Sequence, residues 1–142
     1  MALPIKGGKV GTPYGKKGDM WSHGIHKGVD YPTKAGTNVL AAADGRVVGI
    51  GSWGSAFGAH SVIIQHEVKG KTVWAVYAHL MQNDVKKGDK VKLGQVIGKS
   101  GGRPGHPEDG NTTGEHLHFE VQHSAGWSWD GHIDPKILLD VK

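Results

Sequence analysis

Twenty-four glycines are spread through a chain of 142 residues, and short apolar runs lie between them. Glycine weakens regular helices and is typical of tight turns, so this spacing favours short strands joined by turns. SVIIQHEV (61–68) and KTVWAVYAH (71–79) have the composition of half-buried or fully buried strands, and the VKGK between them predicts a hairpin. Helical periodicity is nearly absent. We expect a mostly β fold: an antiparallel sheet or sandwich with little helix and long rim loops that form a groove.

The chain has the length of one domain with a buried core, and no low-complexity linker or repeat divides it. We therefore expect a single domain over residues 1–142. The absence of cysteine excludes disulfides, thiolate metal sites and cysteine nucleophiles. No apolar stretch has the length of a transmembrane span or of a signal-peptide core, so we expect neither membrane insertion nor a secretory signal in this chain.

The charge balance is moderately basic, with a net charge of +4 and a pI near 9.3. This favours a polyanionic neighbour, either nucleic acid or an anionic cell-wall polymer. The lysines stand singly or in pairs, which is also typical of an ordinary solvated surface. Of the five tryptophans, Trp127 and Trp129 lack basic neighbours, so a packing or rim role suits them better and we expect no nucleic-acid binding.

Two histidines lie two positions apart in the predicted strand EHLHFEVQ (115–122). Strand side chains alternate between faces, so His116 and His118 leave the same face while Leu117 and Phe119 point into a core. Two imidazoles on a rigid strand suit a metal site. A solvent-exposed polar face is the alternative interpretation.

A second pair, His26 and Asp30, lies in the segment HKGVDYP. Neutral imidazole and carboxylate are both zinc ligands, and a catalytic zinc takes three protein ligands and leaves a fourth position for water. His26, Asp30 and one histidine of the 116/118 pair would supply such a set. The spacing alone does not choose between His116 and His118.

Hydrolysis at such a site also needs a group that transfers protons. The helical motif His-Glu-x-x-His, in which a glutamate is the base, is absent: in HEVKG (66–70), Gly70 stands in the position of the second histidine. Histidines titrate near neutral pH. The histidine of the strand pair that does not bind metal, together with His79 in VYAHL, is therefore the candidate for this role.

Several separated segments occur in the order found in lysostaphin-type (LytM-like) zinc metalloendopeptidases, and the chain resembles that family from about residue 11 to 139. The segments are GIHKGVDYP, GTNVLAAADGRVVGIG, VYAHL, VKKGDKVKLGQVIGKSG, TGEHLHFEV and the closing IDPKILL.

The resemblance implies a single metalloendopeptidase catalytic domain with one catalytic Zn²⁺ on the floor of a loop-walled groove. It implies His26, Asp30 and His118 as zinc ligands, with His116 and His79 as the catalytic histidines. The implied reaction is hydrolysis of a peptide bond in bacterial peptidoglycan, in the stem peptide or the cross-bridge. The loop sequences do not indicate which bond.

Candidate substrate-binding residues come from two sources: the resemblance suggests Tyr14, and a segment before the HLH strand looks long beside the family pattern. A tyrosine of the N-terminal loop often assists the transition state in the family, and Tyr14 lies in that region. The segment GGRPGHPEDGNTTG (101–114) would wall the groove, with a surface loop as the alternative. Its polar candidates are His106, Asn111, Thr112 and Thr113.

The biological setting is also an expectation. We expect a monomer that acts on peptidoglycan peptides at the bacterial cell wall, without the wall-binding module often fused to family members. With no signal peptide, it would be a bacteriolytic, antimicrobial phage lysin (endolysin) released by host export or lysis, or an excised domain of a secreted protein.

Two other functions fit parts of the sequence. A non-catalytic relative would bind the wall or activate another hydrolase, but such relatives usually lack ligands and here all five site positions are filled. A biotinyl- or lipoyl-type carrier is suggested by VKKGDKVKLGQVIGKSG, yet it gives no reason for the set His26, Asp30 and His118.

Overall fold

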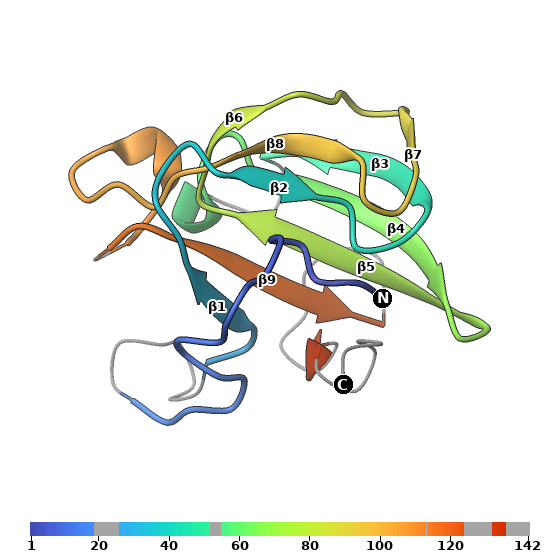
Figure 1. The fold of residues 1–142 in the computed structure, drawn as a ribbon, viewed down its shortest axis with the longest axis horizontal. Coiled ribbons are helices and arrows are strands. Elements are labelled where there is room, and N and C mark those ends of the chain that lie inside the picture. Colours follow the sequence, from blue (N-terminus) through green and yellow to red (C-terminus); the bar gives the residue numbers. More distant parts are fainter. Residues whose placement is uncertain (19–25, 52–54, 113, 124–131, 136–142) are drawn as a thin grey trace.

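The structure is a computed structural model that describes residues 1–18, 26–51, 55–112, 114–123 and 132–135 (Figure 1). These residues form antiparallel strands, with helix limited to single 3-10 turns such as η2 (Ser55–Phe57) and η3 (Pro107–Asp109). The strands are β1 (Val29–Pro32), β2 (Asn38–Leu40), β3 (Gly45–Ile50), β4 (Val62–Val68), β5 (Lys71–Ala78), β6 (Leu80–Asn83), β7 (Lys90–Val91), β8 (Val96–Ser100), β9 (His116–Gln122) and β10 (His132–Ile133). The mostly β fold predicted from the glycine spacing is confirmed.

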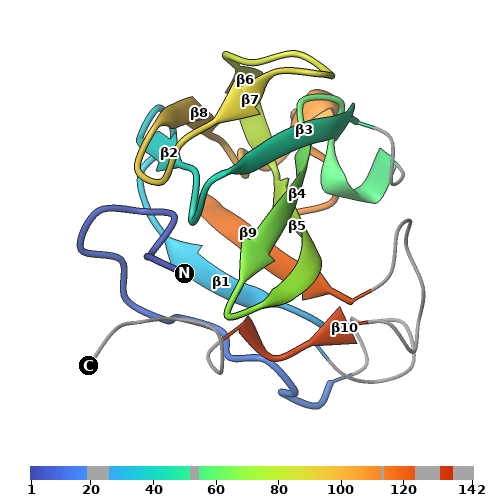
Figure 2. The ribbon, with the colours of Figure 1, turned by 90° about the vertical axis from the view of Figure 1, so that its right-hand side faces the viewer.

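The strands form two sheets. The larger has the order β1-β9-β5-β4-β3-β7, with β10 paired to β9, and the smaller has the order β2-β8-β6. The smaller sheet lies over one face of the larger (Figures 1 and 2), and buried residues of both sheets, such as Ile97 and Phe119, belong to one apolar cluster. The core therefore lies between the sheets. None of the helices in the described ranges is long and apolar enough to cross a membrane.

The hairpin predicted at VKGK joins β4 and β5. Val68 pairs directly with Lys71, which leaves a two-residue loop. Lys69 and Gly70 both have positive φ, at 52° and 79°. This is the conformation of the primed turns that match the twist of antiparallel strands, and glycine adopts it at little cost.

Strand β9 separates the core from the opposite face of the larger sheet. Leu117, Phe119 and Val121 are fully buried in the core cluster. By alternation, His116, His118 and Glu120 point to the other face, where Val76 and Ala78 of β5 lie opposite Glu120 and His118. This second face carries the candidate site.

Candidate active site

Strand register brings the predicted site residues together. Strand β9 lies between β1 and β5, and His118 pairs with Asp30 on one side and with Ala78 on the other. His79 directly follows Ala78, and His26 lies shortly before β1. Residues far apart in the sequence therefore meet at adjacent positions of three hydrogen-bonded strands.

Three side chains present metal-ligating atoms to one point. Nε2 of His26 lies 3.3 Å from Oδ1 of Asp30 and 3.2 Å from Nδ1 of His118. That Nδ1 lies 2.9 Å from the same carboxylate oxygen. Zinc bonds of about 2.0–2.2 Å in a tetrahedron separate neighbouring ligand atoms by about 3.3–3.6 Å. The triangle fits a tetrahedral zinc after an opening of a few tenths of an ångström, with the fourth corner left for another ligand.

Hydrogen bonds on the far side of each imidazole orient these donors. Nδ1 of His26 donates to the carbonyl oxygen of Pro13 at 3.1 Å. Nε2 of His118 donates to Oε1 of Glu120 at 3.1 Å, and Glu120 also accepts from Gln122 at 3.0 Å. Such partners fix the tautomer of a metal-binding histidine and make it more basic. They direct Nε2 of His26 and Nδ1 of His118 toward Asp30.

The electrostatics of the group favour a cation. Burial raises the pKa of the Asp30 carboxyl, but hydrogen bonds from His118 and His26 outweigh it and hold this pKa well below its usual range. For His118, burial lowers the pKa, but Asp30 and Glu120 together raise it to about 9. A bound metal would take the place of the His118 Nδ1 proton that faces Asp30, and the Nε2–H would stay bonded to Glu120.

His116 and His79 lie beside this group with a different arrangement. Nδ1 of His116 donates to the carbonyl of Gly114 at 2.6 Å, and Nδ1 of His79 donates to that of Asp109 at 2.8 Å. Each imidazole is thereby held with Nε2 as the free acceptor. The two ring centroids are 4.9 Å apart, and Nε2 of His116 approaches Oδ1 of Asp30 to 3.6 Å.

His79 is constrained in two further ways. Its φ of 64° is unusual for a residue other than glycine, and strained backbone of this kind is frequent at functional sites. Burial and the neighbouring His118 lower the pKa of His79 to about 4. The imidazole is therefore neutral at neutral pH.

The structure describes four of the five candidate substrate-binding residues, and one of them reaches the site: Oγ1 of Thr112 lies 3.4 Å from Nδ1 of His116. The Tyr14 hydroxyl is 2.5 Å from Nδ1 of His132, beside the end of β9. His106 is exposed and 3.2 Å from Oε1 of Glu108, and Asn111 is exposed with its backbone N–H bound to Ala56. Thr113 lies outside the described residues. Substrate binding by these residues stays a prediction.

Three further residues contribute to the site. Glu120, which shares the strand face of His116 and His118, is 1% exposed and bonded to His118. Phe57 stacks on the His118 ring with centroids 5.8 Å apart. Asp109 is fully buried although it lies in a glycine-rich loop. No local pattern marks Phe57 or Asp109, because both reach the site through the conformation of loops.

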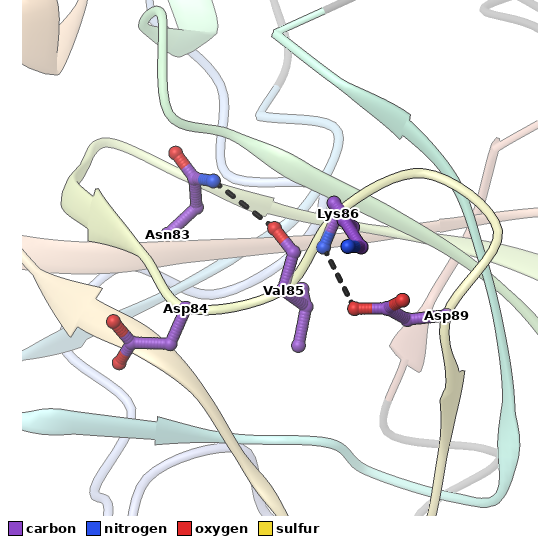
Figure 3. A pocket seen from close by; sticks show the side chains of 5 residues that line it. All are labelled: Asn83, Asp84, Val85, Lys86 and Asp89. Carbon is purple, nitrogen blue, oxygen red and sulfur yellow. Dashed lines mark hydrogen bonds between the residues drawn. The ribbon is translucent and has the colours of Figure 1, made fainter.

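A separate hollow lies in the connection between β6 and β7 (Figure 3). Asn83 bonds the carbonyl of Val85, and the Lys86 backbone bonds Asp89, as is usual in turns. The hollow is lined by Asn83, Asp84, Val85, Lys86 and Asp89. It contains no histidine, so the cluster on β1, β9 and β5 is the candidate functional site.

Comparison with known proteins identifies the family. The model of peptidase family M23 matches residues 24–134, which include all five histidine and aspartate positions described above. The chain belongs to peptidase family M23. Its fold is the lysostaphin-type catalytic domain, as the resemblance of the sequence motifs implied.

Two relatives match two thirds or more of this chain. Glycyl-glycine endopeptidase ALE-1 of Staphylococcus capitis is 37% identical over 112 residues, which are 79% of this chain and 28% of ALE-1. Peptidoglycan DD-endopeptidase ShyC of Vibrio cholerae is 41% identical over 95 residues, or 67% of this chain and 19% of ShyC. The chain therefore spans less than a third of the length of these relatives.

The solved catalytic domain of lysostaphin from Staphylococcus simulans superimposes with a TM-score of 0.79 at 33% identity. The match covers 96% of this M23 chain and 95% of that domain.

Proposed function

We propose that this M23 domain is a zinc-dependent endopeptidase that hydrolyses peptide bonds of bacterial peptidoglycan, in the stem peptide or the cross-bridge. The observation that carries the proposal is the His26–Asp30–His118 triangle, with edges of 2.9 to 3.3 Å, beside two further imidazoles. A purely structural polar cluster would not need five such groups in contact with one another. Family membership and the names of the relatives support the same substrate class.

In this proposal Nε2 of His26, Oδ1 of Asp30 and Nδ1 of His118 hold the metal. When bound, zinc supplies Lewis acidity: it polarises a carbonyl and acidifies water. Asp30 contributes the anionic charge, and Glu120 and Pro13 keep the two imidazoles in the ligating tautomer.

His116 and His79 transfer the protons. Peptide hydrolysis removes a proton from the attacking water and delivers one to the leaving amine. Both histidines donate Nδ1–H to backbone carbonyls and keep Nε2 available for these transfers. His79 is neutral at neutral pH, so its Nε2 carries no proton there.

The proposal also includes the place where the protein acts. We infer action on peptidoglycan peptides at the cell wall by a monomeric lysin, supported by the net charge of +4, which suits an anionic polymer. The relatives are named as glycyl-glycine and DD-endopeptidases, so both bond classes are candidate substrates.

Mass spectrometry of muropeptides tests the proposal. Walls with glycine bridges and walls with direct cross-links would be incubated with the zinc-loaded chain, with chelator, and with chelator followed by zinc. We expect new amino termini from one wall type, lost with chelator and restored by zinc. Zinc binding without cleavage of either wall would instead support the non-catalytic, wall-binding alternative.

A further inference from the structure

One loop supplies the hydrogen-bond acceptors of both proposed proton-transfer histidines. This segment connects β8 to β9, and its described residues, 101–112 and 114–115, are orange in Figure 1. Its Asp109 carbonyl accepts from His79 Nδ1 at 2.8 Å, and its Gly114 carbonyl accepts from His116 Nδ1 at 2.6 Å. The conformation of the loop therefore sets which nitrogen of each imidazole is free.

An ion pair between Asp109 and Arg103 holds the part of this loop that contains Asp109. Oδ2 of Asp109 accepts from Arg103 Nε at 2.8 Å and from the Arg103 backbone N–H at 3.0 Å. Oδ1 accepts from Arg103 Nη2 at 3.0 Å. The aspartate side chain is 0% exposed and that of the arginine 26%. A two-point guanidinium contact restricts orientation as well as distance.

Close packing leaves the pair little freedom. A Cβ on Gly101 would lie 2.6 Å from Asp109 Oδ2, and one on Gly58 would lie 3.1 Å from the Asp109 carbonyl oxygen. The 3-10 turn η3, which ends at Asp109, is bonded to the segment after η2 through Ala59 N–H and the Glu108 carbonyl at 2.9 Å. His79 is bonded to both turns. Its backbone N–H donates to the Phe57 carbonyl of η2 at 2.8 Å, and its ring donates to the Asp109 carbonyl of η3.

We propose that Arg103 and Asp109 are positioning residues for His79. The ion pair fixes the peptide plane that carries the Asp109 carbonyl, and that carbonyl holds His79 in the Nδ1–H tautomer with Nε2 directed to the site. The inference rests on the proposed function, in which His79 transfers a proton. Without the pair, the carbonyl turns and the imidazole samples other orientations and the other tautomer.

The test compares Asp109→Asn with Glu108→Gln in the zinc-loaded chain. Asparagine turns one carboxylate acceptor into a donor that faces arginine N–H groups. Glu108→Gln is the control, because it also removes a carboxylate beside Arg103. The Glu108 side chain is 42% exposed, and its contact with Nη2, at 3.3 Å, is longer than the contacts of Asp109. Because misplacement of about 1 Å can cost about 100-fold in rate, we expect D109N to lower kcat about 10- to 100-fold. We expect KM and zinc content to stay unchanged.

Long-range ¹⁵N–¹H NMR of the His79 ring separates positioning from a merely structural role. The unmodified chain and E108Q should show a single Nδ1–H tautomer, and D109N a mixture. If D109N does not fold, Arg103→Lys carries the same expectations, since lysine keeps the charge and the backbone donor but loses the two-point contact. A single unchanged tautomer in the folded variant would overturn the proposal, whatever happens to kcat. An unmodified chain that cleaves no peptidoglycan would refute the proposed function, and the tautomer comparison would still decide the positioning role.

Discussion

His116 and His118 leave one strand on one face, yet their surroundings give them different capabilities. His118 directs Nδ1 at Asp30 and is held from behind by the carboxylate of Glu120. His116 is held by a backbone carbonyl and keeps its Nε2 free. Side-chain alternation predicts the shared face, but the partner behind each ring decides which atom is free.

Glu120 provides a test of this orientation at the scale of one residue. In Glu120→Gln the charged acceptor of His118 Nε2–H becomes neutral, so His118 is a poorer and less oriented ligand. Loss of such a partner typically costs about 10- to 100-fold in metal affinity, and we expect at least about 10-fold weaker zinc binding in competition with a chelating dye. Glu67→Gln is the control, because Glu67 is exposed on β4 and bonds Thr72. Equal zinc affinities in both variants would contradict the orienting role.

At the scale of elements, β9 combines two tasks through its alternation. One face contributes Leu117, Phe119 and Val121 to the core, and the other carries the site histidines and Glu120. The pairing of β9 with β1 and β5 sets the separation of Asp30, His118 and His79. Strand spacing is therefore part of the geometry of the proposed metal site.

Gly28 tests this spacing. A Cβ there would lie 2.7 Å from Cε1 of His118 and 2.7 Å from the Phe119 carbonyl oxygen. Gly28→Ala should push the segment before β1 away from β9, destabilise the fold by about 1–3 kcal/mol through overpacking, and weaken zinc binding. Denaturant unfolding and zinc competition measure the two effects. Unchanged zinc affinity would show that the contact does not set the ligand spacing.

The hairpin between β4 and β5 gives a prediction that concerns stability alone. Gly70 has a φ of 79° and nothing within 4 Å of the position of a Cβ. Gly70→Ala should therefore cost only the backbone strain of a left-handed residue, about 1–2 kcal/mol in the free energy of unfolding. Zinc affinity should not change. Lys69→Asn, which suits a primed turn, should not destabilise. An unchanged free energy of unfolding in Gly70→Ala would refute the turn assignment.

For the whole molecule, His66 predicts a dependence of stability on pH. It is fully buried between the Asp44 carbonyl and the Tyr77 hydroxyl, at 3.1 and 2.8 Å. Burial lowers the pKa of His66 in the folded protein, so the unfolded chain binds the proton more readily. The stability contributed by neutral His66 is present above the unfolded pKa of about 6.5 and is lost as pH falls. Urea unfolding at pH 7.5 and 5.5 should show a smaller loss for His66→Gln than for the unmodified chain; an equal loss would contradict this.

Glycine spacing and alternation are local signals, and they predicted the class of the fold and the shared face of His116 and His118. Ligand chemistry and the family resemblance added His26, Asp30 and His79. The sequence did not predict that Asp109 is buried, that Arg103 pairs with it, or that Phe57 stacks on His118. Those features depend on how loops pack against each other. A polar, glycine-rich sequence is equally typical of an exposed loop. Alternation places His116 and His118 on the same face, so only the family resemblance indicated which of them binds the metal.

In the proposed function, His118 holds the metal and His116 transfers protons beside it. Zinc content per chain, measured by elemental analysis on folded His118→Ala and His116→Ala, distinguishes these two roles. We expect H118A to lose zinc, and H116A to retain one zinc per chain while its peptidoglycan cleavage collapses. Zinc retained in H118A and lost in H116A would show that His116, and not His118, holds the metal.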